Sequence, residues 1–142
     1  MLQYRKALEK QKKDKIKSVE NITFIHDGLM WQDSDVNVKL KLNRLEFKMY
    51  CKNLDFANKK DWKVPSYDEM ITLVDYSKFT PAGINKIKYI IPSKYWTSSA
   101  SVLEKKKNWF VNFDDGTSGI DLDLKHYNIR CVRKISSKEG EY

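Results

Sequence analysis

The chain has 142 residues, of which 41% are hydrophobic and 13% aromatic. This length suits a single domain, and this apolar content excludes a chain that is disordered throughout. No run of about 18 apolar residues is present, so the sequence predicts no transmembrane helix.

The formal net charge is +8, and half of it comes from the first 20 residues, which hold seven basic and three acidic side chains. Their helix propensity is high but their apolar stripe is thin, which predicts a basic helical extension or tether over residues 1–20. Such a segment is either simply solvated or attracted to an acidic surface. It lacks the apolar core of a signal peptide, so the chain is either a mature form whose export signal has been removed or a cytosolic protein.

Residues 22–32 have strand character, and residues 40–57 are predicted to be helical. In the helix, an apolar face with 3–4 residue spacing is formed by Phe47, Tyr50, Cys51 and Leu54. Leu42, Leu45 and Met49 fall on another side, so this helix is expected to be covered from two directions.

A second helix has a clear start signal. Ser66 follows Pro65, and Glu69 comes three residues later, which is the pattern of a capping box. Met70, Leu73 and Val74 are expected to form its buried stripe. Breakers such as Pro81 and Pro92 predict an irregular segment over residues 77–94.

The periodicity then changes to two residues, which is typical of strands. Trp109, Val111 and Phe113 are expected to face the core, and residues 114–116 form a hairpin turn. On the return strand Asp121 and Asp123 are expected to face solvent, and a last strand covers residues 128–135 before a polar tail at 136–142. Early helices and late strands predict an α+β class, with two helices packed on a twisted antiparallel sheet and the first strand near the last.

Six motifs in order, GLMWQD, YCKNL, DWKVPSYDEM, YWTSSA, W-x-V-x-F-x-x-G and IRCVR, resemble the bacterial Lcl C-terminal domain family, named for the C-terminal domain of a collagen-like adhesin. The resemblance covers residues 21–135, which we take as the domain. It implies a fold similar to C-type lectins and to the formylglycine-generating enzyme group. Where the family commonly has D-W-R-L-P-T, this chain has D-W-K-V-P-S at residues 61–66.

The resemblance also implies a disulfide between Cys51 and Cys131, because C-type lectin-like domains commonly join the first helix to the final strand in this way. A disulfide indicates an oxidising compartment, and the expected location is therefore the periplasm or the cell surface. Two buried free thiols are the alternative, since cysteine is often buried without a bond.

Catalytic and metal signatures are sparse. The two histidines, His26 and His126, belong to no recognisable motif. Formylglycine-generating relatives use cysteines for catalysis, whereas here both cysteines occupy the implied structural positions, so we expect no enzyme activity. No C-x-x-C zinc pattern is present. Asp114 and Asp115 offer oxygens to calcium, but Asp-Asp-Gly is first of all a turn sequence, so we expect no metal and no cofactor.

The remaining candidates are basic loops, which we expect to line one rim and to bind acidic or sulfated glycans. Plain solvation of these lysines is the alternative. The candidate ligand-binding residues are Lys86, Lys88, Lys94, Lys105, Lys106 and Lys107. Trp62, Trp96 and Trp109 are expected to pack in the core rather than to stack on sugars.

The sequence thus predicts a non-enzymatic binding domain of the bacterial envelope or cell surface. The alternative is a structural or assembly module that docks through its basic N-terminal helix to a partner chain or a membrane. A glycan or an envelope protein is the expected partner, an oligomer is compatible with the sequence, and no sequence-specific nucleic-acid binding is expected.

Overall fold

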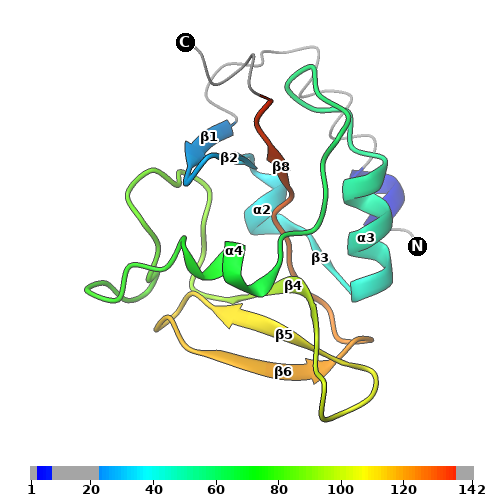
Figure 1. The fold of residues 1–142 in the computed structure, drawn as a ribbon, viewed down its shortest axis with the longest axis vertical. Coiled ribbons are helices and arrows are strands. Elements are labelled where there is room, and N and C mark those ends of the chain that lie inside the picture. The colour runs from blue at the N-terminus through cyan, green and yellow to red at the C-terminus, as the bar shows by residue number, and fades with distance from the viewer. Residues whose placement is uncertain (1–2, 8–22, 137–142) are drawn as a thin grey trace.

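A computed structural model of the protein describes residues 3–7 and 23–136. These residues form an α+β domain of short helices and strands (Figure 1), which confirms the predicted class. The helices are a segment at residues 3–7, α2 (Val36–Lys39), α3 (Arg44–Lys52) and α4 (Tyr67–Ile71). The strands are β1 (Thr23–His26), β2 (Leu29–Gln32), β3 (Lys41–Leu42), β4 (Lys94–Ala100), β5 (Lys107–Asn112), β6 (Ser118–Leu122), β7 (Tyr127–Asn128) and β8 (Val132–Lys134).

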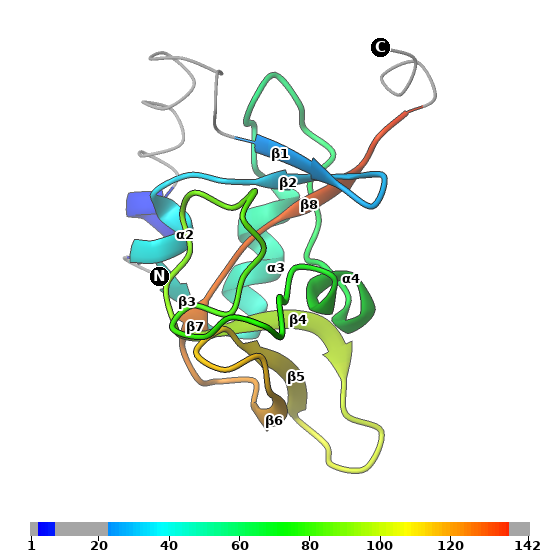
Figure 2. The same ribbon diagram turned by 90° about the vertical axis from the view of Figure 1, so that its left-hand side faces the viewer.

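The strands belong to two sheets, one in the order β1-β2-β8 and one in the order β3-β7-β4-β5-β6. Figure 2 shows the smaller sheet at one end of the molecule and β5 and β6 at the other, with α3 between them. The larger sheet is mixed, because Tyr95 of β4 pairs with Asn128 of β7 in parallel. The prediction of one antiparallel sheet is therefore wrong.

The predicted last strand at 128–135 is two separate strands, β7 and β8. Because β7 runs parallel to β4, the larger sheet is mixed. Residues 127–128 pair within the larger sheet, and β8 pairs with β2 in the smaller one. Between them the chain leaves both sheets to bury Arg130 and Cys131. The first predicted strand, residues 22–32, folds as a hairpin of β1 and β2. Strand β2 pairs with β8, which confirms that the first and last strands lie close together.

Helix α3 is shorter than the predicted 40–57. A capping box starts it: the Glu46 backbone N donates to Asn43 Oδ1 at 2.9 Å, and the Asn43 backbone N donates to Glu46 Oε1 at 3.1 Å. Residues 41–42 before this cap pair with β7 instead. The predicted apolar face is confirmed, since its four residues are buried. The other side is covered in part, because Leu42 is buried and Met49 packs against the core, whereas Leu45 is 68% exposed.

Helix α4 begins as predicted. The Glu69 backbone N donates to Ser66 Oγ at 3.1 Å, and the Ser66 backbone N donates to Glu69 Oε1 at 2.8 Å. Met70 is buried within the helix, and Leu73 and Val74 are buried just beyond its end. The predicted irregular segment follows as far as the start of β4.

The β5–β6 hairpin forms around the predicted turn, but two of its expected orientations are wrong. Val111 and Phe113 are buried, whereas Trp109 is 36% exposed, with its ring 5.3 Å from that of Tyr67, the first residue of α4. On β6 the Asp121 carboxylate is half-buried and accepts from Tyr127, and Leu122 is the exposed neighbour.

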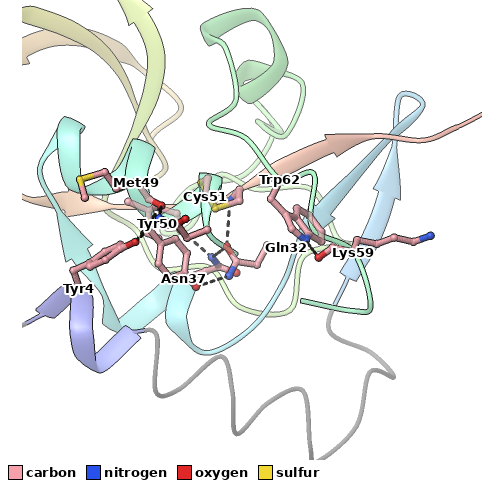
Figure 3. Close-up of a disulfide and its surroundings, with 11 residues drawn as sticks. Tyr4, Gln32, Asn37, Met49, Tyr50, Cys51, Lys59 and Trp62 are labelled. Atoms are coloured by element: carbon pink, nitrogen blue, oxygen red, sulfur yellow. Dashed lines mark hydrogen bonds between the residues drawn. A yellow bond between two sulfur atoms is a disulfide. The ribbon is translucent and has the colours of Figure 1, made fainter. Parts of the chain in front are cut away.

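The disulfide between Cys51 and Cys131 is present and links residues 80 positions apart, from α3 to the residue before β8 (Figure 3). The Gln32 side chain lies beside it. Gln32 Nε2 donates to the Tyr50 hydroxyl at 3.0 Å, and Gln32 Oε1 accepts from the Cys131 backbone N at 3.1 Å. Helix α3, the end of β2 and the residue before β8 therefore meet at one buried junction.

Arg130 is buried next to this junction and is fully paired. Its Nη1 donates to the Gln32 carbonyl at 2.6 Å and lies 3.4 Å from Asp33 Oδ1, while Nη2 donates to the Tyr89 carbonyl. The Asp33 carboxylate also accepts from the backbone N atoms of Lys88 and Tyr89, at 3.0 and 2.9 Å. This network fixes the irregular segment before β4 to the end of β2.

The N-terminal segment is helical at residues 3–7, and it packs on the domain rather than standing in solvent. Tyr4 and Ala7 are buried in the same cluster as Phe47 and Cys51. The Tyr4 hydroxyl donates to the Met49 carbonyl at 3.3 Å and accepts from Asn53 Nδ2 at 2.8 Å. The rest of the predicted extension, residues 1–2 and 8–20, lies outside the described residues.

We predict that Cys51→Ala together with Cys131→Ala lowers the free energy of unfolding by about 4 kcal/mol, because the unfolded chain loses a cross-link that closes a long loop. Urea denaturation of the oxidised wild type and the double variant measures the difference. Equal denaturation midpoints would contradict this role of the disulfide.

Arg130→Met should cost about 3–5 kcal/mol, because it leaves the buried Asp33 carboxylate without its cation. A matched control is Arg133→Met, whose partner Asp61 has a side chain that is 63% exposed and stays hydrated; we expect about 1 kcal/mol there. Thermal and urea unfolding measure the stability of the two variants. Equal losses of unfolding free energy would show that the Arg130 network contributes no more than the Arg133–Asp61 pair.

Candidate functional site

A cleft of about 560 Å³ opens between α3, the segment at residues 60–64 and β4. We call it the basic cleft, and its lining residues are Arg44, Lys48, Lys52, Lys60, Asp61, Trp62, Lys63, Val64 and Ser98. Five of these nine side chains are cationic and one is acidic. This concentration of positive charge is the most pronounced chemical feature of the cleft.

One wall of the cleft is a single face of α3. Arg44, Lys48 and Lys52 are spaced four residues apart, which places them in a row along a helix. The adjoining face carries Phe47 and Cys51, each three residues from a cation of the row, and both are buried in the core. The amphipathic pattern of α3 therefore directs its three cations to the cleft.

The other wall is held in place by long-range contacts. Lys63 pairs with Val132 of β8 through two backbone hydrogen bonds of 2.8 and 2.9 Å. Trp62 Nε1 donates to the carbonyls of Phe56 and Lys59, at 3.2 and 3.1 Å, so the ring is fixed at 3% exposure. These contacts bring Lys60 and Lys63 opposite α3.

The acid in the cleft is already neutralised. Arg133 Nε donates to Asp61 Oδ1 at 2.6 Å, and Arg133 Nη2 donates to Asp61 Oδ2 at 3.2 Å, a two-point pairing with a guanidinium from β8. Lys63 Nζ lies 3.5 Å from Glu69, so part of its charge is balanced too. Lys48, Lys52 and Lys60 are exposed, and with Arg44 they leave the cleft strongly positive.

Arg44 is the most unusual of these cations. Its Nη2 is 3.5 Å from the Ser98 carbonyl, but Nε and Nη1 are buried without a hydrogen-bond partner among the described residues. Burial lowers the pKa of the Arg44 guanidinium, and the nearby Asp123 carboxylate partly offsets this. The residue also stands at the first position of α3, where the helix dipole disfavours a cation. Its placement therefore costs stability, and the negative charge of an anionic ligand in the cleft would offset part of that cost.

The cleft has the chemistry of an anion-binding site. Guanidinium and ammonium groups bind sulfate, carboxylate and phosphate through charge-assisted hydrogen bonds. A row of cations along a helix suits an extended anion with several charged groups better than one small ion. Within residues 3–7 and 23–136, no group of three or more His, Cys, Asp and Glu side chains gathers as a metal site; Asp115, considered above for calcium, instead accepts from Thr117.

The six lysines singled out in the sequence are not brought to one rim. Lys94 begins β4 and pairs with Asn112, whereas Lys107 begins β5 beyond the other end of β4. A strand of this length separates its ends by about 20 Å. The expectation that the two basic loops line one rim is therefore wrong, because β4 lies between them (Figure 1).

Half of these lysines also have partners. Lys86 Nζ donates to the Ile25 carbonyl at 2.9 Å, Lys94 Nζ lies 4.8 Å from the centre of the Phe110 ring, and Lys107 is paired with Glu104. Lys88, Lys105 and Lys106 are exposed. Their part in ligand binding stays a prediction.

The histidines and tryptophans fall outside any catalytic grouping within the described residues. His26 Nε2 lies 3.1 Å from the Thr72 carbonyl, and His126 Nε2 lies 3.4 Å from Glu46. Trp62 and Trp96 are buried as predicted, at 3% and 0% exposure. Trp109 is the exception noted above.

The basic cleft was not predicted from the sequence, although the cations of one of its walls can be recognised there. The spacing R-x-x-x-K-x-x-x-K at residues 44–52 lies within the predicted helix, beside its apolar face. The other wall is not readable, because Lys60 and Lys63 reach α3 only through the pairing of Lys63 with Val132, which is 69 positions away (132 minus 63).

These observations define a disulfide-linked α+β domain with a cationic cleft. The chain belongs to the Lcl C-terminal domain family, whose model matches residues 22–133. This match confirms the resemblance on which the disulfide was expected. No match was found among curated proteins. No helix in the described part of the chain combines the length and apolar character needed to cross a membrane.

Because Arg44 is partly desolvated and stands at the wrong end of the helix dipole, we predict that Arg44→Met leaves the free energy of unfolding unchanged or raises it by about 1 kcal/mol. Lys48→Met, at an exposed position of the same face, serves as the control and should be neutral. Urea denaturation distinguishes them, and a loss above about 1 kcal/mol for Arg44→Met would show that the residue is structural.

Proposed function

We propose that this protein is a non-enzymatic binding module of the bacterial envelope or cell surface, and that it recognises acidic or sulfated glycans through the basic cleft. One observation carries the proposal: five cations line one cleft whose single carboxylate is already paired with Arg133. Such a cleft stays positive at neutral pH and favours a polyanion over a neutral sugar.

The location and the fold type belong to the same proposal. Membership of the Lcl C-terminal domain family supports an adhesin-like module outside the cytoplasm, and the disulfide supports an oxidising compartment. We also propose that the arrangement of helices and strands is the C-type lectin-like one that the sequence motifs imply.

A binding role suits the residues of the cleft better than a catalytic one. Its lining offers cations, a paired carboxylate and the hydroxyl of Ser98, but neither histidine nor cysteine. Nucleophilic and acid–base mechanisms need a nucleophile beside a base. Both cysteines are committed to the disulfide, which argues against chemistry like that of the formylglycine-generating group.

The assembly role through the N-terminal helix has less support. The described part of that helix packs on the protein's own α3 through Tyr4 and Ala7. Binding should therefore be measured on the full chain, because removing the segment would uncover Met49 and Asn53, which contact Tyr4.

The test is the affinity of the full oxidised chain for a heparin oligosaccharide and for a neutral dextran, by calorimetry at two salt concentrations. We expect binding to heparin alone, weakening with salt. The affinity for heparin should fall about tenfold or more in the triple variant Lys48→Ala, Lys52→Ala and Lys60→Ala. This corresponds to a loss of less than about 1 kcal/mol of binding free energy per lysine.

The matched control removes the same three charges from the loops, through Lys88→Ala, Lys105→Ala and Lys106→Asn. Asparagine is chosen because Lys106 has a φ of 63°, which asparagine tolerates. The control should keep its affinity for heparin. If it loses binding while the cleft variant keeps it, the loops carry recognition as the sequence suggested; binding of dextran as tight as heparin would refute the polyanion proposal.

A further inference from the structure

The loop between β4 and β5 presents apolar side chains to solvent. Val102 is 96% exposed and Leu103 is 90% exposed, more than any other large hydrophobic side chain in the described residues. Burying such side chains elsewhere would be favourable. Exposure of two adjacent ones at a loop tip therefore indicates a contact that the isolated domain does not make.

A second exposed segment adjoins this loop. The Asp123 backbone N donates to the Lys106 carbonyl at 2.8 Å, which joins the turn after β6 to the end of the loop. Leu124, which follows in that turn, is 74% exposed. Figure 1 shows both segments at the same end of the larger sheet.

Most of the exposed charge around these apolar residues is positive, with Asp121 close to Lys125 and Asp123 preceding Leu124 as the neighbouring acids. Glu104 is paired with Lys107 in the same loop, which leaves Lys105 and Lys106 as its exposed cations. Lys125 is exposed in the adjoining turn. We call the set Val102, Leu103, Leu124, Lys105, Lys106 and Lys125 the sheet-end patch.

Two backbone donors at the tip of the loop are already paired within the loop, which lowers the cost of burying them in an interface. The backbone N atoms of Leu103 and Glu104 lie 3.3 and 3.2 Å from Ser101 Oγ, which accepts from both. The Ser101 backbone N donates to the Lys107 carbonyl at 2.9 Å and closes the base of the loop. Internal pairing of this kind matters where water is scarce.

We propose that the sheet-end patch docks the protein on an anionic lipid surface. Val102 and Leu103 enter the boundary between headgroups and acyl chains, and the lysines stay among the phosphates. Apolar residues on a protruding tip with cations set behind them suit this boundary. A protein partner would instead need a broad complementary face of about 800 Å², which a narrow loop does not supply.

This inference is independent of glycan binding in the basic cleft. The test is flotation of the full chain with vesicles of phosphatidylcholine, with and without phosphatidylglycerol. We expect binding to the anionic vesicles only. Val102→Ser with Leu103→Ser should lower the partition coefficient at least about tenfold, and Lys105→Ala with Lys106→Asn should lower it about fivefold per lysine.

Two controls keep the result specific. Leu45→Ser removes an exposed leucine from α3 and should leave vesicle binding unchanged. Lys48→Ala with Lys52→Ala removes two cations from the basic cleft and should lower vesicle binding less than Lys105→Ala with Lys106→Asn does. The inference is overturned if the wild type does not bind anionic vesicles at low salt, or if only the cleft variant loses binding. It is also overturned if sedimentation shows that the loop tip drives self-association, which Val102→Ser with Leu103→Ser abolishes.

Discussion

Burial of the three residues from Ile129 to Cys131 is the constraint on which the rest of the structure depends. Arg130 is 1% exposed, and a charge taken so far from water must be paired. It is paired by the end of β2, through the Gln32 carbonyl and Asp33, and Asp33 in turn holds the segment before β4. One residue later the disulfide attaches α3 to the same point. Two sheets, a helix and a long irregular segment are thus fixed by one short stretch of chain.

The basic cleft follows from this junction. Cys131 fixes α3, and the next residue, Val132, pairs with Lys63 and so positions the opposite wall. Cations held this close repel one another, and Arg44 is in addition desolvated and lacks partners for two of its nitrogens. Such a cluster is tolerated because covalent and buried polar links elsewhere offset its cost. A ligand that brings negative charge would relieve it, which gives the site a physical reason to bind polyanions.

Local features of the fold were readable in the sequence, and distant ones were not. The capping box at Ser66 and the buried face around Phe47 depend on residues within a few positions of each other. The Cys51–Cys131 pair was expected only from the resemblance to the family. The exposed Trp109 was misjudged, because strand alternation predicts which face a side chain takes but not how far α4 covers that face. The six loop lysines were grouped by composition, and β4 separates them in space.

The most direct test of this account is a map of backbone amide shifts as a sulfated disaccharide is titrated into the oxidised, nitrogen-15-labelled protein. If the junction positions a polyanion site, the largest shifts fall on α3 between Arg44 and Lys52, on residues 60–64 and on Ser98. Shifts confined to the segment before β4 or to the β4–β5 loop would contradict the account and return the binding site to the loops.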